Sequence, residues 1–223
     1  MVDDEVQIEV RDTNSLTSQE MNRIIELFEA NYDEADPSYI DKSVDTLKYI
    51  ALASSSSKLV GFGFGETRIM PLPRLSDSEA VALAGMSCVD PTVRQRGLFA
   101  QMALHVLSEG GNVPTHRPYL FCGRMAHAVS YRTIAKMSPA CVPASGVPLS
   151  EWHQETLEAA ATAFGVSVDS NTGIVKGSGR PVGYPRLAFE PTEAERELFQ
   201  NVDRTSGDSL LAIAWLPNAP DGW

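Results

Sequence analysis

The chain has 223 residues, of which 43% are hydrophobic and 21% are charged, a balance that is ordinary for a globular protein and argues against extended disorder. Lysine and arginine number 18 and aspartate and glutamate 29, so the formal net charge is −11. Nucleic acids and anionic membrane surfaces attract basic proteins, so the charge disfavours both as partners.

Three widely spaced cysteines, Cys88, Cys122 and Cys141, form no paired motif and predict neither a disulfide scaffold nor a zinc site. Residues 1–5 are acidic and lack the apolar core of a signal peptide. The longest apolar stretch, residues 80–89, is far shorter than the ~20 residues of a membrane span. We therefore expect a cytoplasmic protein without a bound metal.

The first third of the chain alternates between helical and strand patterns. Residues 6–10 predict a strand, and Thr17 with Glu20 predicts a capping box that opens a helix. A second short helix is expected to end near 45–48. The serines and lysine at 54–58 then separate two apolar runs, which indicates a hairpin. The runs predict strands at 49–53, 59–70 and 80–89, the last two antiparallel.

The middle of the chain predicts a loop at 93–97, a helix at 98–108, a strand at 119–122 and a helix at 126–137. The remainder is less regular. It predicts a helix at 150–164, two short paired segments at 166–168 and 173–175, an exposed loop at 176–186, a helix capped by Thr192 and Glu195, and a last strand at 209–216. We expect one domain, with its core at 6–137 and 209–216 and an elaboration at 138–208.

The segment that carries chemistry follows the strand ending at Val89. Pro91 turns the chain, and a helix begins at Gly97 among basic residues. The first N–H groups of a helix lack intrahelical acceptors and lie at the positive end of its dipole, so they suit a pyrophosphate. Gly97 permits a close approach, and Arg94 and Arg96 are expected to add mobile positive charge.

This segment resembles the acyl-CoA signature of the GNAT N-acetyltransferase superfamily. In that signature a strand ending Val-x-Pro is followed by Arg or Gln, any two residues, Gly, any one residue, and then Gly or Ala. Val89, Pro91, Arg94 and Gly97 are in register, whereas Phe99 departs from the pattern. The resemblance implies a GNAT-like α/β fold, a mixed, mostly antiparallel sheet flanked by helices. It also implies that acetyl-CoA or another acyl-CoA is bound by Cys88, Val89, Arg94, Gln95, Arg96, Gly97, Leu98, Phe99, Ala100, Ser130 and Lys136.

Residues 127–136 resemble the family's segment after its fifth strand, with His127 in place of the usual Asn. In many members a tyrosine on this helix protonates the leaving thiolate, and Tyr131 is the candidate here, with Ser130 as the alternative. In many members the general base that takes the amine's proton is a carboxylate on the strand before the loop. That strand has none, so Glu66 is the first candidate, with Glu79 and His127 as alternatives.

The resemblance implies transfer of an acyl group to a small-molecule or peptide amine, without nucleic acid or membrane. The alternative is a GNAT-fold module that binds acyl-CoA without turnover. The Gly-x-Gly-x-Gly run at 61–65 also fits a nucleotide or S-adenosylmethionine loop, but it continues as a strand, and no helix opens there. Residues 138–208 are expected to shape the acceptor site or a subunit interface, with Tyr184 or Arg186 touching substrate. Whether the chain forms a homodimer is left open by the sequence.

Overall fold

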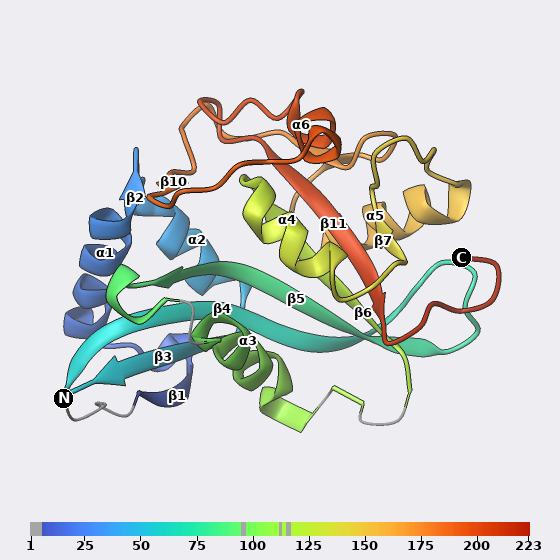
Figure 1. Cartoon of the computed structure of the whole chain (residues 1–223). Helices are drawn as coiled ribbons and strands as arrows, with labels where there is room; N and C mark the ends of the chain where they lie inside the picture. Colours follow the sequence, from blue (N-terminus) through green and yellow to red (C-terminus); the bar gives the residue numbers. More distant parts are fainter. Residues whose placement is uncertain (1–5, 95–96, 112, 115–116) are drawn as a thin grey trace.

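The computed structural model describes residues 6–94, 97–111, 113–114 and 117–223. A twisted sheet crosses the molecule from β1 to the C-terminal strands (Figure 1). Its order is β1 (Gln7–Asp12), β3 (Tyr49–Ser55), β4 (Lys58–Pro71), β5 (Ser78–Val89), β6 (Tyr119–Met125), β11 (Ser209–Leu216), β9 (Ile174–Val175) and β8 (Val168–Asp169), and β7 (Cys141–Val142) also pairs with β11. β5 and β6 are parallel, and the other described pairs are antiparallel.

Helices cover both faces of this sheet. One face packs against α1 (Ser18–Asn31), α2 (Ser38–Thr46) and α5 (Glu151–Ala163), and the other against α3 (Leu98–Ser108), α4 (Ala128–Ala135) and α6 (Glu193–Phe199). Single 3-10 turns occupy Thr13–Ser15, Pro91–Val93 and Glu109–Gly111. The mixed α/β fold and the mostly antiparallel sheet are thereby confirmed, in the element order that the resemblance implies.

The three glycines of β4 explain how α3 comes close to the sheet. A Cβ on Gly61 would lie 3.2 Å from the Met102 side chain, and one on Gly65 would lie 3.1 Å from Val106. Phe62 and Phe64, which alternate with the glycines, are buried on the opposite face. The run at 61–65 is therefore a helix-packing surface within a strand.

The capping boxes begin the helices where the sequence predicts. Thr17 and Glu20 form the capping box of α1, and Thr192 and Glu195 form that of α6. α5 also begins with such a box, in which the ring of His153 takes the place of a carboxylate and accepts from the Ser150 N–H. The predicted pairing near 166–175 is present as β8 and β9. None of the described helices is long and apolar enough to cross a membrane.

Candidate functional site

The site begins where the parallel strands β5 and β6 separate. They pair from Val81 to Ala84 on β5 and from Leu120 to Gly123 on β6, and β5 then continues for five more residues. At the same level β5 pairs irregularly with β4, because Gly65 lies opposite Ala84 whereas Gly63 lies opposite Ser87. The one extra residue on β5 forms a bulge, which bends a strand and increases its twist. The bulge thus accompanies an opening in the sheet.

Ser87 and Val89 direct their main-chain groups into this opening. The Asp90 N–H donates to the Val60 carbonyl, which makes 60/90 and 62/88 the hydrogen-bonded pairs with β4. The alternate residues, Ser87 and Val89, therefore point the other way. Their carbonyls accept from the Tyr32 hydroxyl at 2.8 Å and from Arg94 Nε at 2.9 Å. The two N–H groups are the donors that this edge offers to a ligand.

The N-terminus of α3 follows directly after β5. Its N-cap, Gly97, has φ of +73° and accepts from the Gln101 N–H at 3.0 Å. This left-handed conformation suits glycine, and among the described residues a Cβ there would meet nothing nearer than Gln101 Nε2 at 3.8 Å. Leu98 is buried, whereas Phe99 and Ala100 are exposed. Gln95 and Arg96 lie outside the described residues. Within the described part of the chain, the helix start at Gly97 is therefore uncrowded.

Arg94 is not the mobile charge that the sequence predicts. Its guanidinium donates to the Val89 carbonyl at 2.9 Å, to the Arg186 carbonyl at 2.8 Å and to Asn31 Oδ1 at 3.4 Å. It thus connects the end of β5, the end of α1 and a segment about ninety positions later. The guanidinium thus has three partners within the protein. The role of Arg94 as a CoA ligand stays a prediction.

His127 caps α4 with its ring. Nδ1 accepts from the Val129 N–H at 3.1 Å, so a neutral ring carries its proton on Nε2 and is a donor there. Burial, with a further contribution from Arg204, lowers the pKa of His127 below its usual range and favours this neutral form. An asparagine would offer the same pair of functions, an acceptor for the helix and an N–H donor. The ring is therefore better suited to donate a hydrogen bond than to act as a base.

The Tyr131 hydroxyl is buried and donates to the Pro143 carbonyl at 2.8 Å. Its ring packs edge-on against Phe199, and burial raises its pKa well above the usual range. These contacts are those of a core residue, and the predicted acid role remains a prediction. On the same helix Ser130 is half-buried in the first turn, and Lys136 is exposed at the C-cap.

Of the other predicted residues, Glu66 and Glu79 lie farther from the opening, whereas Cys88 lies between Ser87 and Val89 but is buried. Glu66 pairs with Leu83, below the level at which β5 leaves β6, and its carboxylate accepts from Arg68, which also donates to the Thr46 and Ala163 carbonyls. Glu79 lies eight residues before Ser87 on β5, roughly 26 Å along an extended strand. Cys88 is buried, its thiol lies 3.7 Å from the Leu27 carbonyl, and burial raises its pKa to about 12. The Cys88 thiol is thus a core group.

A segment that we call the strap, residues 176–190, passes over the end of β5 toward α1 (Figure 1). It contains β10 (Tyr184–Pro185), which pairs with β2 (Tyr32–Asp33). The Arg186 N–H donates to the Asn31 carbonyl at 2.8 Å, and its guanidinium pairs with Asp33 at 2.7 Å. The predicted exposed loop at 176–186 is exposed at 176, 178–180 and 186, but it is also held against α1 and α2. The sequence carries no periodic signal for this pairing, because each strand has only two residues and the two strands lie about 150 positions apart.

The strap also contacts α4. Tyr184 and Phe189 lie edge-on to the His127 ring, at 6.2 and 5.2 Å between centroids, and Arg132 stacks over Phe189 at 4.1 Å. Arg132 in turn forms an ion pair with Glu195 of α6. The strap therefore joins the N-terminal helices to the C-terminal half, beside the opening between β5 and β6. Sequence reasoning missed Tyr32 and Asn31, which no motif marks.

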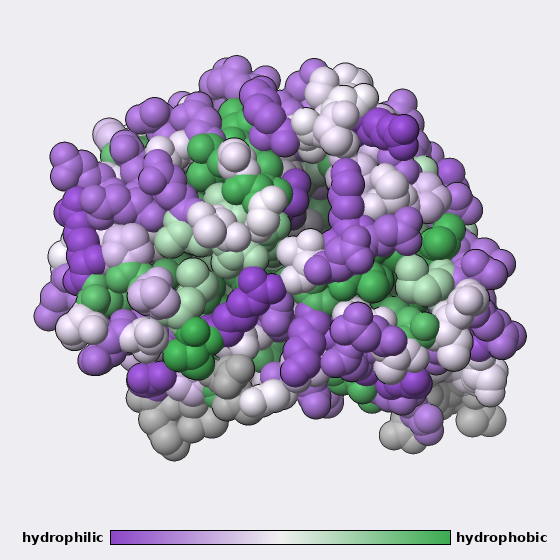
Figure 2. Space-filling view, turned by 180° about the vertical axis from the view of Figure 1, so that it is seen from behind, coloured by the Kyte–Doolittle hydropathy of each residue, from purple (hydrophilic) through white to green (hydrophobic). Residues whose placement is uncertain are grey.

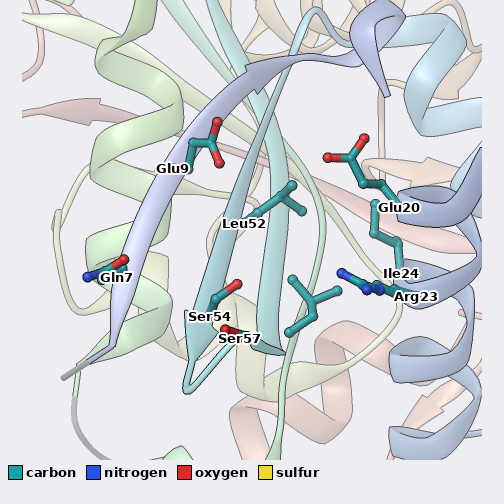
Figure 3. Close-up of a pocket in the computed structure, with 9 residues that line it drawn as sticks. Gln7, Glu9, Glu20, Arg23, Ile24, Leu52, Ser54 and Ser57 are labelled. Atoms are coloured by element: carbon teal, nitrogen blue, oxygen red, sulfur yellow. The ribbon is translucent and has the colours of Figure 1, made fainter. Parts of the chain in front are cut away.

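Two adjoining hollows lie away from the predicted site, between α1 and the β3–β4 hairpin. Their volumes are about 270 and 480 Å³, and both include Arg23, Ser57 and Leu59. In the first, Glu20 and Arg23 of α1 face Glu9 and Leu52 across a groove (Figure 3). No predicted site residue lines either hollow among the described residues.

No family model and no curated protein sequence matches the chain. The solved structures that resemble it include GNAT N-acetyltransferases. YhbS from Escherichia coli in complex with CoA is 14% identical over 59% of this chain and 70% of that chain, with a TM-score of 0.40. Diaminobutyrate acetyltransferase EctA from Paenibacillus lautus, in complex with L-2,4-diaminobutyric acid and CoA, is 14% identical over 57% and 72% of the two chains, with a TM-score of 0.36. NAA60 from Arabidopsis thaliana in complex with acetyl-CoA is 13% identical over 59% and 85%, with a TM-score of 0.41. The likeness is one of fold, and the functional reasoning rests on this chain's own geometry.

Proposed function

We propose that the chain is an acyl-CoA-dependent N-acyltransferase that passes an acyl group directly from the CoA thioester to an amine. The observation that carries this proposal is the opening between β5 and β6, followed at once by the N-terminus of α3. An extended arm with amide groups would fit along the edge of β5, where the Ser87 and Val89 N–H groups point into the opening. A pyrophosphate would lie at the open start of α3 at Gly97.

CoA supplies an activated acyl group, a thioester carbonyl with a thiolate as leaving group. The amine must arrive neutral, form the new C–N bond at the carbonyl carbon and lose a proton as the C–S bond breaks. The Val89 N–H would donate to the carbonyl oxygen, where negative charge develops. His127 Nε2–H is a second donor near the strap. Fixed donors of this kind favour the transition state because they need no rearrangement.

The proton that leaves the amine has two routes. Glu66 lies on the sheet face that carries α1 and α2, but its carboxylate already accepts from Arg68. Transfer through water is the other route. Glu66→Gln separates them, since a direct base would lose at least about a hundredfold in kcat.

The proposal is tested by thiol release from acetyl-CoA in the presence of a panel of primary amines, with calorimetric titration of CoA alongside. Amine-dependent thiol release with formation of the N-acetyl product supports a transferase. Binding of CoA without release for any amine would instead make the chain an acyl-CoA-binding module. Absence of CoA binding would overturn the site itself.

A further inference from the structure

Arg124 lies on β6 just beyond the last residue that pairs with β5. Among the described residues its guanidinium makes one hydrogen bond, from Nε to Ser209 Oγ at 3.3 Å, and it has no carboxylate partner. Burial lowers its pKa, and the nearby Tyr39 phenol opposes that shift. In a chain with a net charge of −11, a half-buried arginine without an acidic partner is able to pair with an anion from outside.

Arg204 is a second arginine near this region that has no acidic partner among the described residues. Arg204 stacks on Tyr184 of the strap at 4.4 Å, has no ion pair among the described residues, and has its pKa lowered by burial. Tyr39 links the two surroundings, because its hydroxyl donates to the Arg180 carbonyl of the strap at 3.1 Å. A Cβ on Gly207, three residues after Arg204, would lie 2.4 Å from the same hydroxyl.

The two aspartates closest to Arg204 in the sequence bind other partners. Asp203 accepts from the Thr205 and Ser206 hydroxyls, each at 2.7 Å. Asp208 is buried and accepts from Lys176 Nζ at 2.7 Å and from the Gly177 N–H at 2.8 Å. Neither Asp203 nor Asp208 is therefore an ion-pair partner of Arg204 or Arg124 among the described residues.

Arg124 lies on the opposite face of the sheet from the predicted phosphate site. Side chains alternate along β6, so Arg124 shares a face with Leu120 and Cys122, which pack with α1 and α2. α3, whose N-terminus would hold the pyrophosphate, packs on the opposite face. Figure 2 shows the side of the molecule away from α3, where hydrophilic and hydrophobic residues are both exposed. The acceptor amine would enter on this side.

Resting on the function proposed above, we propose that the acceptor is a carboxylate-bearing amine of the amino-acid class, and that the guanidinium of Arg124 binds its carboxylate. The planar fork of arginine matches a carboxylate with two parallel hydrogen bonds. The bound carboxylate would hold the amine toward the end of β5. An unmodified peptide N-terminus, which has an amide at this position, would lack that contact.

The test compares acetyl transfer to free L-amino acids and to their α-carboxamides, with rates expressed per neutral amine because the amide lowers the amine pKa. We expect the KM of at least one amino acid to be tenfold or more below that of its amide. Arg124→Gln should remove this difference by raising the amino-acid KM about 10- to 100-fold, the effect of losing a charge-assisted contact. The KM of the amide and the CoA affinity should stay within about twofold.

Arg124→Lys keeps the charge without the fork and should give an intermediate KM. Arg74→Gln, which removes an exposed arginine paired with Glu155, is the matched control and should change nothing. Equal KM values for acids and amides, or an equal loss for both in Arg124→Gln, would overturn the proposal while leaving the transferase function standing.

Binding gives a second readout that does not need turnover. Calorimetric titration of the same amino acids into the CoA complex should show binding to the original chain and to Arg74→Gln, with loss of binding in Arg124→Gln. Circular dichroism checks that each variant is folded. If no amine is acetylated but this pattern is found, the carboxylate site stands and the transferase function fails. If no amino acid binds, the carboxylate site is wrong.

Discussion

Arg94 donates from Nη1 to the main-chain carbonyl of Arg186, with 2.8 Å between nitrogen and oxygen. Since the same guanidinium holds Val89 and Asn31, one side chain fixes the end of β5, the end of α1 and the strap relative to one another. The first residue of the segment that resembles the acyl-CoA signature is therefore a structural connection between the two halves of the chain.

Arg94→Lys should lower the free energy of unfolding by about 2 kcal/mol, because lysine keeps the charge but cannot make three fixed contacts. Urea unfolding measures this loss, and calorimetry should find CoA affinity within about threefold. Arg23→Lys, at an exposed arginine of α1, is the control. Unchanged stability with a large loss of CoA affinity would show that Arg94 serves the ligand instead.

Two substitutions at Gly97 separate charge from backbone strain. Asparagine and aspartate have nearly the same size, and both tolerate the left-handed conformation better than other side chains. Gly97→Asp should bind CoA at least about tenfold more weakly than Gly97→Asn, because it places a negative charge at the helix N-terminus where the pyrophosphate would lie. The difference should shrink at high salt. Equal affinities would place the phosphates elsewhere.

Tyr131→Phe distinguishes a core hydroxyl from a general acid. The hydrogen bond to the Pro143 carbonyl predicts a loss of about 1 kcal/mol in unfolding free energy and a kcat within about threefold of the original. Tyr119→Phe, at a half-buried phenol on β6, is the comparison. A fall in kcat of about 10²- to 10⁴-fold would establish the acid role that the resemblance implies.

His127→Asn should preserve both functions of the ring, the cap on α4 and a side-chain N–H donor, whereas His127→Ala removes both. We expect His127→Ala to lose about 1 kcal/mol of stability, and kcat to fall clearly more than in His127→Asn. Thermal unfolding and steady-state kinetics measure the two effects. A similar kcat for the two variants would exclude the donor role.

Glu195 predicts how stability depends on pH. Hydrogen bonds from Arg132 lower the pKa of its carboxyl from 4.5 to about 2. Because this folded-state pKa lies below the unfolded value, the stabilisation is fully present above pH 4.5 and is lost as the pH falls toward 2. Glu195→Gln should therefore lose up to about 3 kcal/mol at pH 7.

The stability difference between Glu195→Gln and the original chain should narrow steadily below pH 4.5. Urea unfolding at pH 7 and pH 3 measures it, with Glu193→Gln, an exposed residue in the same turn, as the control. A difference that does not change with pH would mean that the ion pair with Arg132 does not act on the titration of Glu195.

The order of helices and strands was readable from the sequence because its signals are local. Alternation marks β1, the Thr17–Glu20 pair marks the start of α1, and the polar break at 54–58 marks the β3–β4 hairpin. The start of α3 at Gly97 also follows from a few adjacent residues. Such features depend on neighbours within a few positions, so periodicity and capping predict them.

Only the tertiary structure decided what each candidate side chain does. Nothing near Arg94 in the sequence indicates that its charge is directed to a carbonyl 92 positions later, or that Tyr131 donates to Pro143. The same holds for Arg124, which reads as an ordinary strand residue and is notable only because no acid lies against it among the described residues. Hydrogen bonds and ion pairs between distant segments depend on how the chain folds back on itself, which no local pattern records.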